Sequence, residues 1–145
     1  MNLVAKKADA IPAVTGKGHE LFRKAIQALN ELPQAHLETK HNLHAGVYSR
    51  TVFIPKGVML IGTEMQCATM LVQYGYGRFS DGSHSKDLKG YVVMEGLPHR
   101  QCAFLAYEDT WATMYFATKA KTIEEAEKEF CSEPSTLLSN KEKGQ

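Results

Sequence analysis

A series of short apolar segments between residues 48 and 118, separated by glycine and proline, constrains the fold of this chain most strongly. The first, YSRTVFIP at residues 48–55, is rich in β-branched and aromatic residues, which favour strands. Similar segments cover residues 58–61, 69–76, 89–94, 101–107 and 111–118. Asp81-Gly82 suits a tight hairpin, because glycine adopts the positive φ that such turns need. This spacing predicts an antiparallel barrel or sandwich.

Helical patterns occur only at the two ends of this region. Apolar residues from Gly18 to Leu32 lie on one stripe, and Pro33 ends that helix. Thr122 to Glu125 forms a Thr-x-x-Glu capping box that begins a short second helix. We therefore predict an irregular arm at residues 1–17, a single domain at 18–131 and a mobile tail at 132–145. Residues expected in the core are Phe53, Ile54, Leu71, Val92, Phe104 and Trp111.

Composition argues against several classes of function. The chain has 145 residues and a formal net charge of +1, so no global field attracts nucleic acid or an anionic membrane. Its apolar runs reach about five residues, far short of a membrane span. No signal-peptide pattern follows Lys6 and Lys7. The three cysteines lie far apart without a C-x-x-C pair, which favours a reducing cytoplasm over a disulfide framework.

Two flanking segments and one short motif carry a family resemblance. GVYSRTVFIPKG at residues 46–57 and AYEDTWATMYFATKAKTIEEAEKEF at 106–130 resemble small cupin-like proteins, many of them encoded by bacteriophages. GLPHR at residues 96–100 resembles the second cupin motif. The resemblance covers residues 36–131. It implies a mainly β fold: a double-stranded β-helix barrel with an N-terminal helix and a short C-terminal helix.

The resemblance also indicates where a metal would be held. In cupins the first motif supplies two histidines and a glutamate and the second motif a third histidine, which together form a facial metal site. His99 occupies the second motif. The first motif falls within residues 57–75, which contain no histidine. Depending on register, its ligand positions are Gly62, Glu64 and Ala68, or Met65, Ala68 and Thr69. We therefore expect no cofactor and no tightly bound metal; His99 and Glu64 would be the ligands of any metal present.

Further side chains are candidates for a pocket in the barrel. Met65 and Thr69 remain there as apolar or mildly polar groups. His41 and His44 precede the first long strand, and we expect them to fold over the barrel mouth. Arg50 lies within an apolar strand, so it either faces water at an edge or pairs with a carboxylate such as Glu64 or Glu108. Tyr107 is the last of these candidates for the pocket. Cys67 and Cys102 are expected to be small buried hydrophobic residues.

Two functional hypotheses remain open. The favoured one is a non-catalytic cupin-like protein that binds a partner protein or a small ligand, with His99 at the barrel mouth near Glu64. The resemblance to phage-encoded proteins implies a role as a phage accessory protein. The alternative is a metal-dependent dioxygenase or isomerase that uses His99, Glu64 and a borrowed His41 or His44. A homodimer formed through sheet edges is also expected, because an exposed strand edge is a ready surface for pairing.

Overall fold

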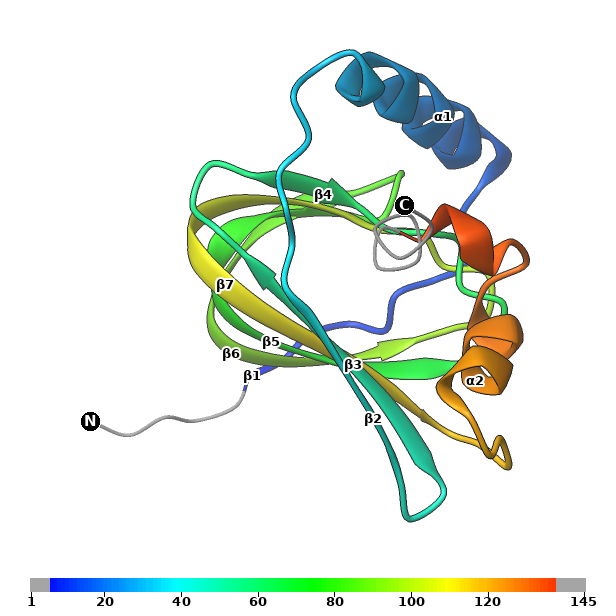
Figure 1. Cartoon of the computed structure of the whole chain (residues 1–145). Coiled ribbons are helices and arrows are strands. Elements are labelled where there is room, and N and C mark those ends of the chain that lie inside the picture. The colour runs from blue at the N-terminus through cyan, green and yellow to red at the C-terminus, as the bar shows by residue number, and fades with distance from the viewer. Residues whose placement is uncertain (1–5, 138–145) are drawn as a thin grey trace.

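The computed structural model describes residues 6–137 and shows a strongly curved, mainly antiparallel sheet with helices outside it (Figure 1). The elements are β1 (Lys6–Lys7), α1 (Gly16–Asn30), β2 (Thr39–His44), β3 (Val47–Ile54), β4 (Met59–Ile61), β5 (Thr69–Ser80), β6 (Ser85–Gly96), β7 (Ala103–Ala117), α2 (Ile123–Phe130) and a 3-10 turn (Pro134–Thr136). The predicted mainly β fold with a helix towards each end is confirmed. Within the described residues, no helix is long and apolar enough to cross a membrane.

Strand β7 is the centre of the sheet, whose order is β1-β6-β5-β7-β3-β2. It pairs antiparallel with both β3 and β5, and its first residues also pair with β4. The sequence predicted two strands here, at 101–107 and 111–118, because Glu108 and Asp109 interrupt the apolar pattern. The structure instead has one strand of 15 residues. The polar interruption falls where the β5–β7 register shifts, beside Tyr74 and Tyr76.

This register shift is a β-bulge that bends the sheet. Gly75 lies in the bulge with φ +156°, and a Cβ there would come within 2.7 Å of the Thr110 Cα atom. The Thr110 hydroxyl accepts a hydrogen bond from the Tyr76 amide at 3.2 Å and donates one to the Glu108 carbonyl at 2.9 Å. The bend therefore depends on a glycine and on a fully buried threonine.

The predicted Asp81-Gly82 hairpin joins β5 to β6. Gly82 has φ +92°, and the Asp81 carboxylate accepts hydrogen bonds from the Ser83 and His84 amides at 2.8 and 2.7 Å. Partial burial raises the pKa of Asp81, but these amide donors outweigh it and leave the pKa below its usual value. The turn is thus fixed by an aspartate and a glycine, as the dipeptide predicted.

The core lies on the concave face of the sheet. Ile54, Leu71, Val92 and Phe104 are buried there, as predicted. The prediction was wrong for Trp111, which is 46% exposed, and Phe53 is only half-buried. These two rings face each other across β3 and β7 on the convex face, with centroids 4.6 Å apart. Alternation along a strand explains the error, since Ile54 and Phe53 are neighbours and must point to opposite faces.

The chain ends are more ordered than the sequence indicated. The predicted arm contains β1, which pairs parallel with β6, and Ile11, which is 2% exposed. Helix α1 begins at Gly16 after the N-cap Thr15, whose hydroxyl accepts from the Gly18 amide at 3.0 Å. In the predicted tail, Leu137 is buried. Residues 138–145 lie outside the described residues, so the mobility predicted there stays a prediction.

Helix α2 packs against the end of the sheet. Its predicted capping box is present: the Glu125 amide donates to the Thr122 hydroxyl at 3.1 Å. Phe130 closes the helix on the core side, where its ring stacks on Tyr48 at 5.6 Å and meets Phe116 at 6.0 Å. A second α2 side chain, Glu127, also lies in the interior, where it is 2% exposed.

Candidate functional site: a cavity inside the barrel

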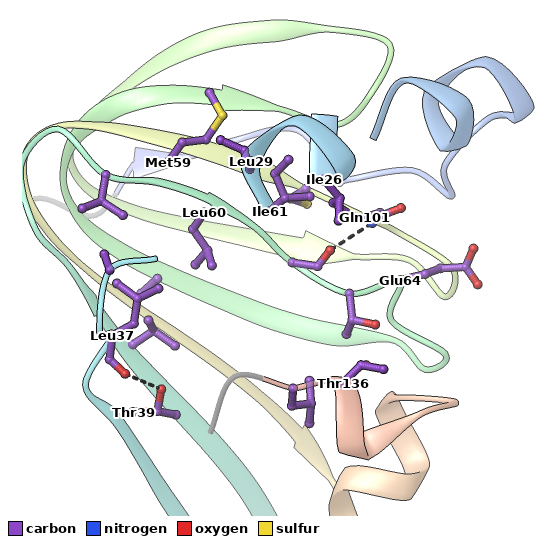
Figure 2. Close-up of a pocket in the computed structure, with 18 of the residues that line it drawn as sticks. Ile26, Leu29, Leu37, Thr39, Met59, Leu60, Ile61, Glu64, Gln101 and Thr136 are labelled. Atoms are coloured by element: carbon purple, nitrogen blue, oxygen red, sulfur yellow. Dashed lines mark hydrogen bonds between the residues drawn. The ribbon is translucent and has the colours of Figure 1, made fainter. Parts of the chain in front are cut away.

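A cavity of about 890 Å³ opens into the concave side of the sheet. Strands β3, β4 and β7 form its walls, and α1 with the segment that follows it covers one side (Figure 2). Most of the wall is apolar and includes Leu37, Val52, Leu60, Leu71, Met114 and Leu137. A space of this size and character is typical of small-molecule sites.

One charged group in the wall, Arg50 on β3, is paired. Its Nη1 atom lies 3.8 Å from the Glu127 carboxylate, and both side chains are nearly buried, at 13% and 3% exposure. The Arg50 guanidinium also lies 6.0 Å from the centre of the Phe130 ring. The sequence suggested Glu64 or Glu108 as the partner; the true partner comes from α2, whose docking against the sheet the strand pattern did not reveal.

A second arginine in the wall, Arg100, was overlooked in the sequence although it follows His99 directly. It is 6% exposed. Its Nε donates to the Thr69 hydroxyl at 3.1 Å, and its Nη1 donates to the Cys102 sulfur at 3.6 Å. The side chain crosses Gly96 so closely that a Cβ there would lie 2.4 Å from Nε. Arg100 is therefore held in one position on the cavity wall.

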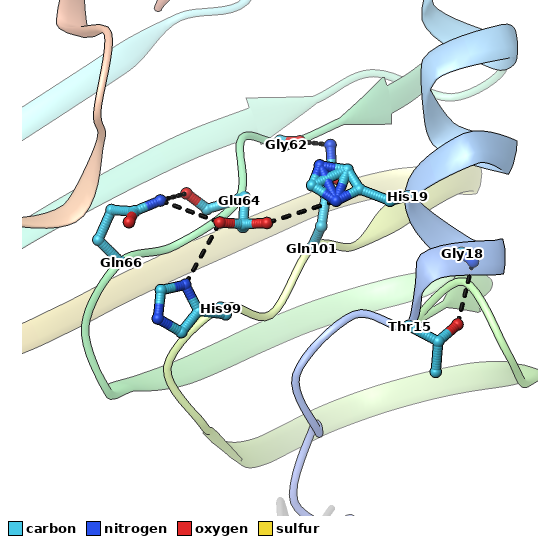
Figure 3. A network of polar contacts seen from close by, with 8 residues as sticks. All are labelled: Thr15, Gly18, His19, Gly62, Glu64, Gln66, His99 and Gln101. Atoms are coloured by element: carbon cyan, nitrogen blue, oxygen red, sulfur yellow. Dashed lines mark hydrogen bonds and ion pairs between the residues drawn. The ribbon is translucent and has the colours of Figure 1, made fainter.

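At the rim of the cavity, Glu64 lies between two imidazoles (Figure 3). Its Oε2 is 3.3 Å from Nδ1 of His99, and its Oε1 is 3.5 Å from Nδ1 of His19 on α1. Gln66 donates to the same carboxylate at 3.1 Å. His99 and Glu64 thus meet as the sequence predicted, whereas His19 was missed because the helical pattern does not say which strand loop the helix faces.

These rim residues do not fit a facial metal site. A facial site needs donors that converge on one point with open positions, but here the carboxylate separates the two imidazoles, which approach different oxygens (Figure 3). Across residues 6–137 no group of three or more His, Cys, Asp or Glu side chains is arranged to hold a metal ion. We therefore derive no chemistry through a metal.

The other predicted site residues lie in several places. Met65 lines the cavity, and Thr69 is buried behind Arg100. His41 is part of β2 rather than a flap, and its Nδ1 is 2.8 Å from the Tyr48 hydroxyl. His44 ends β2 beside a small separate pocket. The Tyr107 ring meets the Tyr76 ring edge-on, with centroids 5.1 Å apart, and neither residue lines the main cavity. Both histidines thus lie on β2, paired with β3, and not on a segment folded over the barrel mouth.

The cysteines near the site are less enclosed than expected. Cys67 and Cys102 are both half-buried rather than fully buried. Burial still raises the pKa of each thiol. Neither is therefore an activated nucleophile, which would need a lowered pKa.

No family model matches the sequence, and no curated protein matches it. Solved structures do match. Ectoine synthase from P. lautus is 12% identical, with a TM-score of 0.51 over 68% of this chain and 75% of that one. A cupin-2 domain protein from Rhodospirillum rubrum is also 12% identical, with a TM-score of 0.52 over 63% of this chain and 66% of that one. The chain has a cupin fold. At these identities the likeness shows the cupin fold alone.

Proposed function

We propose that this cupin-fold chain is a non-catalytic binding protein that encloses a small, largely apolar molecule in its barrel cavity. The cavity of about 890 Å³ with its apolar wall supports this most directly. Each CH₂ group that a ligand buries there contributes about 0.8 kcal/mol. A modest hydrocarbon body can therefore offset the entropy lost on binding.

The alternative, a metal-dependent dioxygenase or isomerase, receives less support. Such an enzyme needs metal ligands that converge beside the substrate. His19 joins the candidates His99 and Glu64, but the two imidazoles lie on either side of the Glu64 carboxylate instead of converging with it on a common point. The imidazoles are also 56% exposed, and exposed ligands are held loosely. We therefore favour binding without a metal.

A cavity-filling variant tests the proposal. Ala112 lines the cavity on β7, so Ala112→Phe should occupy part of it. Ala117 at the exposed end of the same strand allows Ala117→Phe as a matched control. We expect the neutral dye Nile red to fluoresce with the unmodified protein and the control, and to lose about tenfold in affinity with Ala112→Phe. Equal binding by all three proteins would show that the cavity is not a binding site.

We also propose that two copies associate through the convex face of the sheet. Phe53, Trp111, Tyr74 and Tyr91 are register partners that form one row across β3, β7, β5 and β6. The last three are 46%, 45% and 38% exposed. Aromatic residues without charges typify the centre of a protein interface, and a net charge of +1 opposes self-association little.

A role as a phage accessory protein in the host cytoplasm rests on the resemblance of residues 46–57 and 106–130 to phage-encoded cupin-like proteins. Antibody detection in fractionated, phage-infected cells would test it. Presence of the protein in the soluble fraction only after infection is the expected result. Its presence in uninfected cells would contradict the role.

A further inference from the structure

The two arginines in the cavity wall differ in whether a described acidic side chain pairs with them. Arg50 has the Glu127 carboxylate at 3.8 Å. Arg100, in contrast, has no carboxylate within 4 Å among residues 6–137, although it is 6% exposed. An unpaired buried charge is costly because it loses its water without gaining a counter-ion. The cavity thus contains one cation whose charge no described acidic side chain compensates.

The neighbours of Arg100 also fix the position of its guanidinium. Thr69 and Cys102 accept from Nε and Nη1, and Gly96 leaves the space in which the side chain lies. A guanidinium has five N–H donors, and the described residues accept from two of its nitrogens. Arg100 lines the cavity, and no described residue accepts a hydrogen bond from its Nη2. A planar guanidinium fixed in this way suits the two oxygens of a carboxylate.

Glu64, the acidic side chain among the described lining residues, does not supply that acceptor. Figure 2 shows the Glu64 carboxylate at the edge of the site, pointing away from Leu60 and Leu37. Its oxygens already contact His19, His99 and Gln66. Among residues 6–137, therefore, no acidic side chain is placed to neutralise Arg100, and a ligand can supply that anion.

We propose that the cavity binds an amphipathic monocarboxylate, with its head group on Arg100 and its hydrocarbon body along the apolar wall. The inference rests on the proposed binding function and names its ligand class. One negative charge matches the one uncompensated cation. A phosphate dianion would leave an excess charge in an apolar space. Leu37, Leu60 and Leu71 offer the surface for the hydrocarbon body.

Isothermal titration of the unmodified protein with decanoate and with 1-decanol tests the ligand class, because the two probes share a chain and differ in charge. We expect decanoate to bind about tenfold to a hundredfold more tightly, the usual gain from hydrogen bonds to a charged group. Equal affinities would overturn the carboxylate inference while leaving the binding function intact. Binding of neither probe, together with no Nile red binding, would overturn both.

Arg100→Gln assigns the preference to this residue, and Arg78→Gln is the matched control. Arg78 is an exposed arginine that pairs with Asp87 at 3.2 Å and does not line the cavity. We expect Arg100→Gln to bind decanol as before but to lose its preference for decanoate, and the control to keep it. Retained decanol binding shows that the variant is folded. A preference that survives Arg100→Gln would refute the role of Arg100. If that variant does not fold, Arg100→Lys takes its place and should weaken decanoate binding alone.

Discussion

Replacing Phe130 by alanine should destabilise the protein more than any replacement on the convex face. Phe130 is 1% exposed and lies at the end of α2. Its ring stacks on Tyr48, meets Phe116 edge-on and lies beneath the Arg50 guanidinium. The change therefore removes the main apolar contact between α2 and the sheet.

The expected loss of unfolding free energy follows from the area that the Phe130 side chain buries. An aromatic side chain buries about 150–250 Å², and at about 25 cal/mol per Å² this amounts to roughly 4–6 kcal/mol as an upper bound. Measured Phe→Ala changes in cores cost about 3–5 kcal/mol. Because Phe130 also borders the cavity, its neighbours cannot close the new space easily. We expect Phe130→Ala to lower the free energy of unfolding by about 4 kcal/mol.

Trp111→Ala is the natural comparison, since the sequence placed this larger ring in the core. It is 46% exposed and contacts Phe53 on an open face, so its removal leaves no enclosed void. We expect a loss of about 1–2 kcal/mol in the monomer, most of it from the ring pair and partial burial.

Urea denaturation followed by circular dichroism measures both variants. With a slope of about 2 kcal/mol per M, Phe130→Ala should lower the midpoint by about 2 M and Trp111→Ala by less than about 1 M. Measurements at two protein concentrations separate folding from dimer dissociation. A Phe130→Ala shift no larger than that of Trp111→Ala would refute the docking of α2 on the core.

Three further outcomes are expected. Trp111→Lys should lower the fraction of dimer in sedimentation experiments, because it puts a charge into the apolar row; an unchanged dimer fraction, or a monomeric parent protein, would count against the convex-face interface. Protein purified without added metal should contain well under one equivalent of Fe, Mn, Ni or Zn by elemental analysis; near-stoichiometric metal that His99→Ala removes would restore the enzyme hypothesis. Iodoacetamide at pH 8 should modify Cys102 more slowly than free cysteine, because burial raises the pKa of this thiol and the thiolate is the reactive form; a rate equal to that of free cysteine would contradict this.

The local signals in the sequence were sufficient for most of the fold. The turn at Asp81-Gly82, the cap at Thr122 and the apolar strand segments each depend on neighbouring residues, so they could be predicted directly. The strand at residues 39–44 was missed, because HNLH lacks β-branched residues and pairs with β3 through its backbone. Trp111 was misplaced because hydrophobicity alone does not say which face of a strand is covered.

Less of the candidate site could be predicted, because most of its contacts join segments that are far apart in the sequence. The His99–Glu64 contact could be anticipated from the motif positions, as both sit on loops at the barrel rim. The Arg50–Glu127 pair and the approach of His19 could not, because each joins the barrel to a helix. Arg100 was visible in the sequence, but its significance is that no carboxylate of residues 6–137 pairs with it, which only the packing around Thr69 and Gly96 reveals.

The central position of β7 has a consequence for how the protein is made. This strand holds β3, β4 and β5 together, yet it begins only at Ala103. During synthesis the β2–β3 and β5–β6 hairpins can form from local contacts, but the second edge of β3 must wait for β7, whose Ala117 pairs with Val47 from nearly half the chain away. Long-range pairing of this kind slows folding. Until Ala117 leaves the ribosome, β3 and β5 each present a bare edge, and the nascent chain is then most exposed to aggregation and to chaperones.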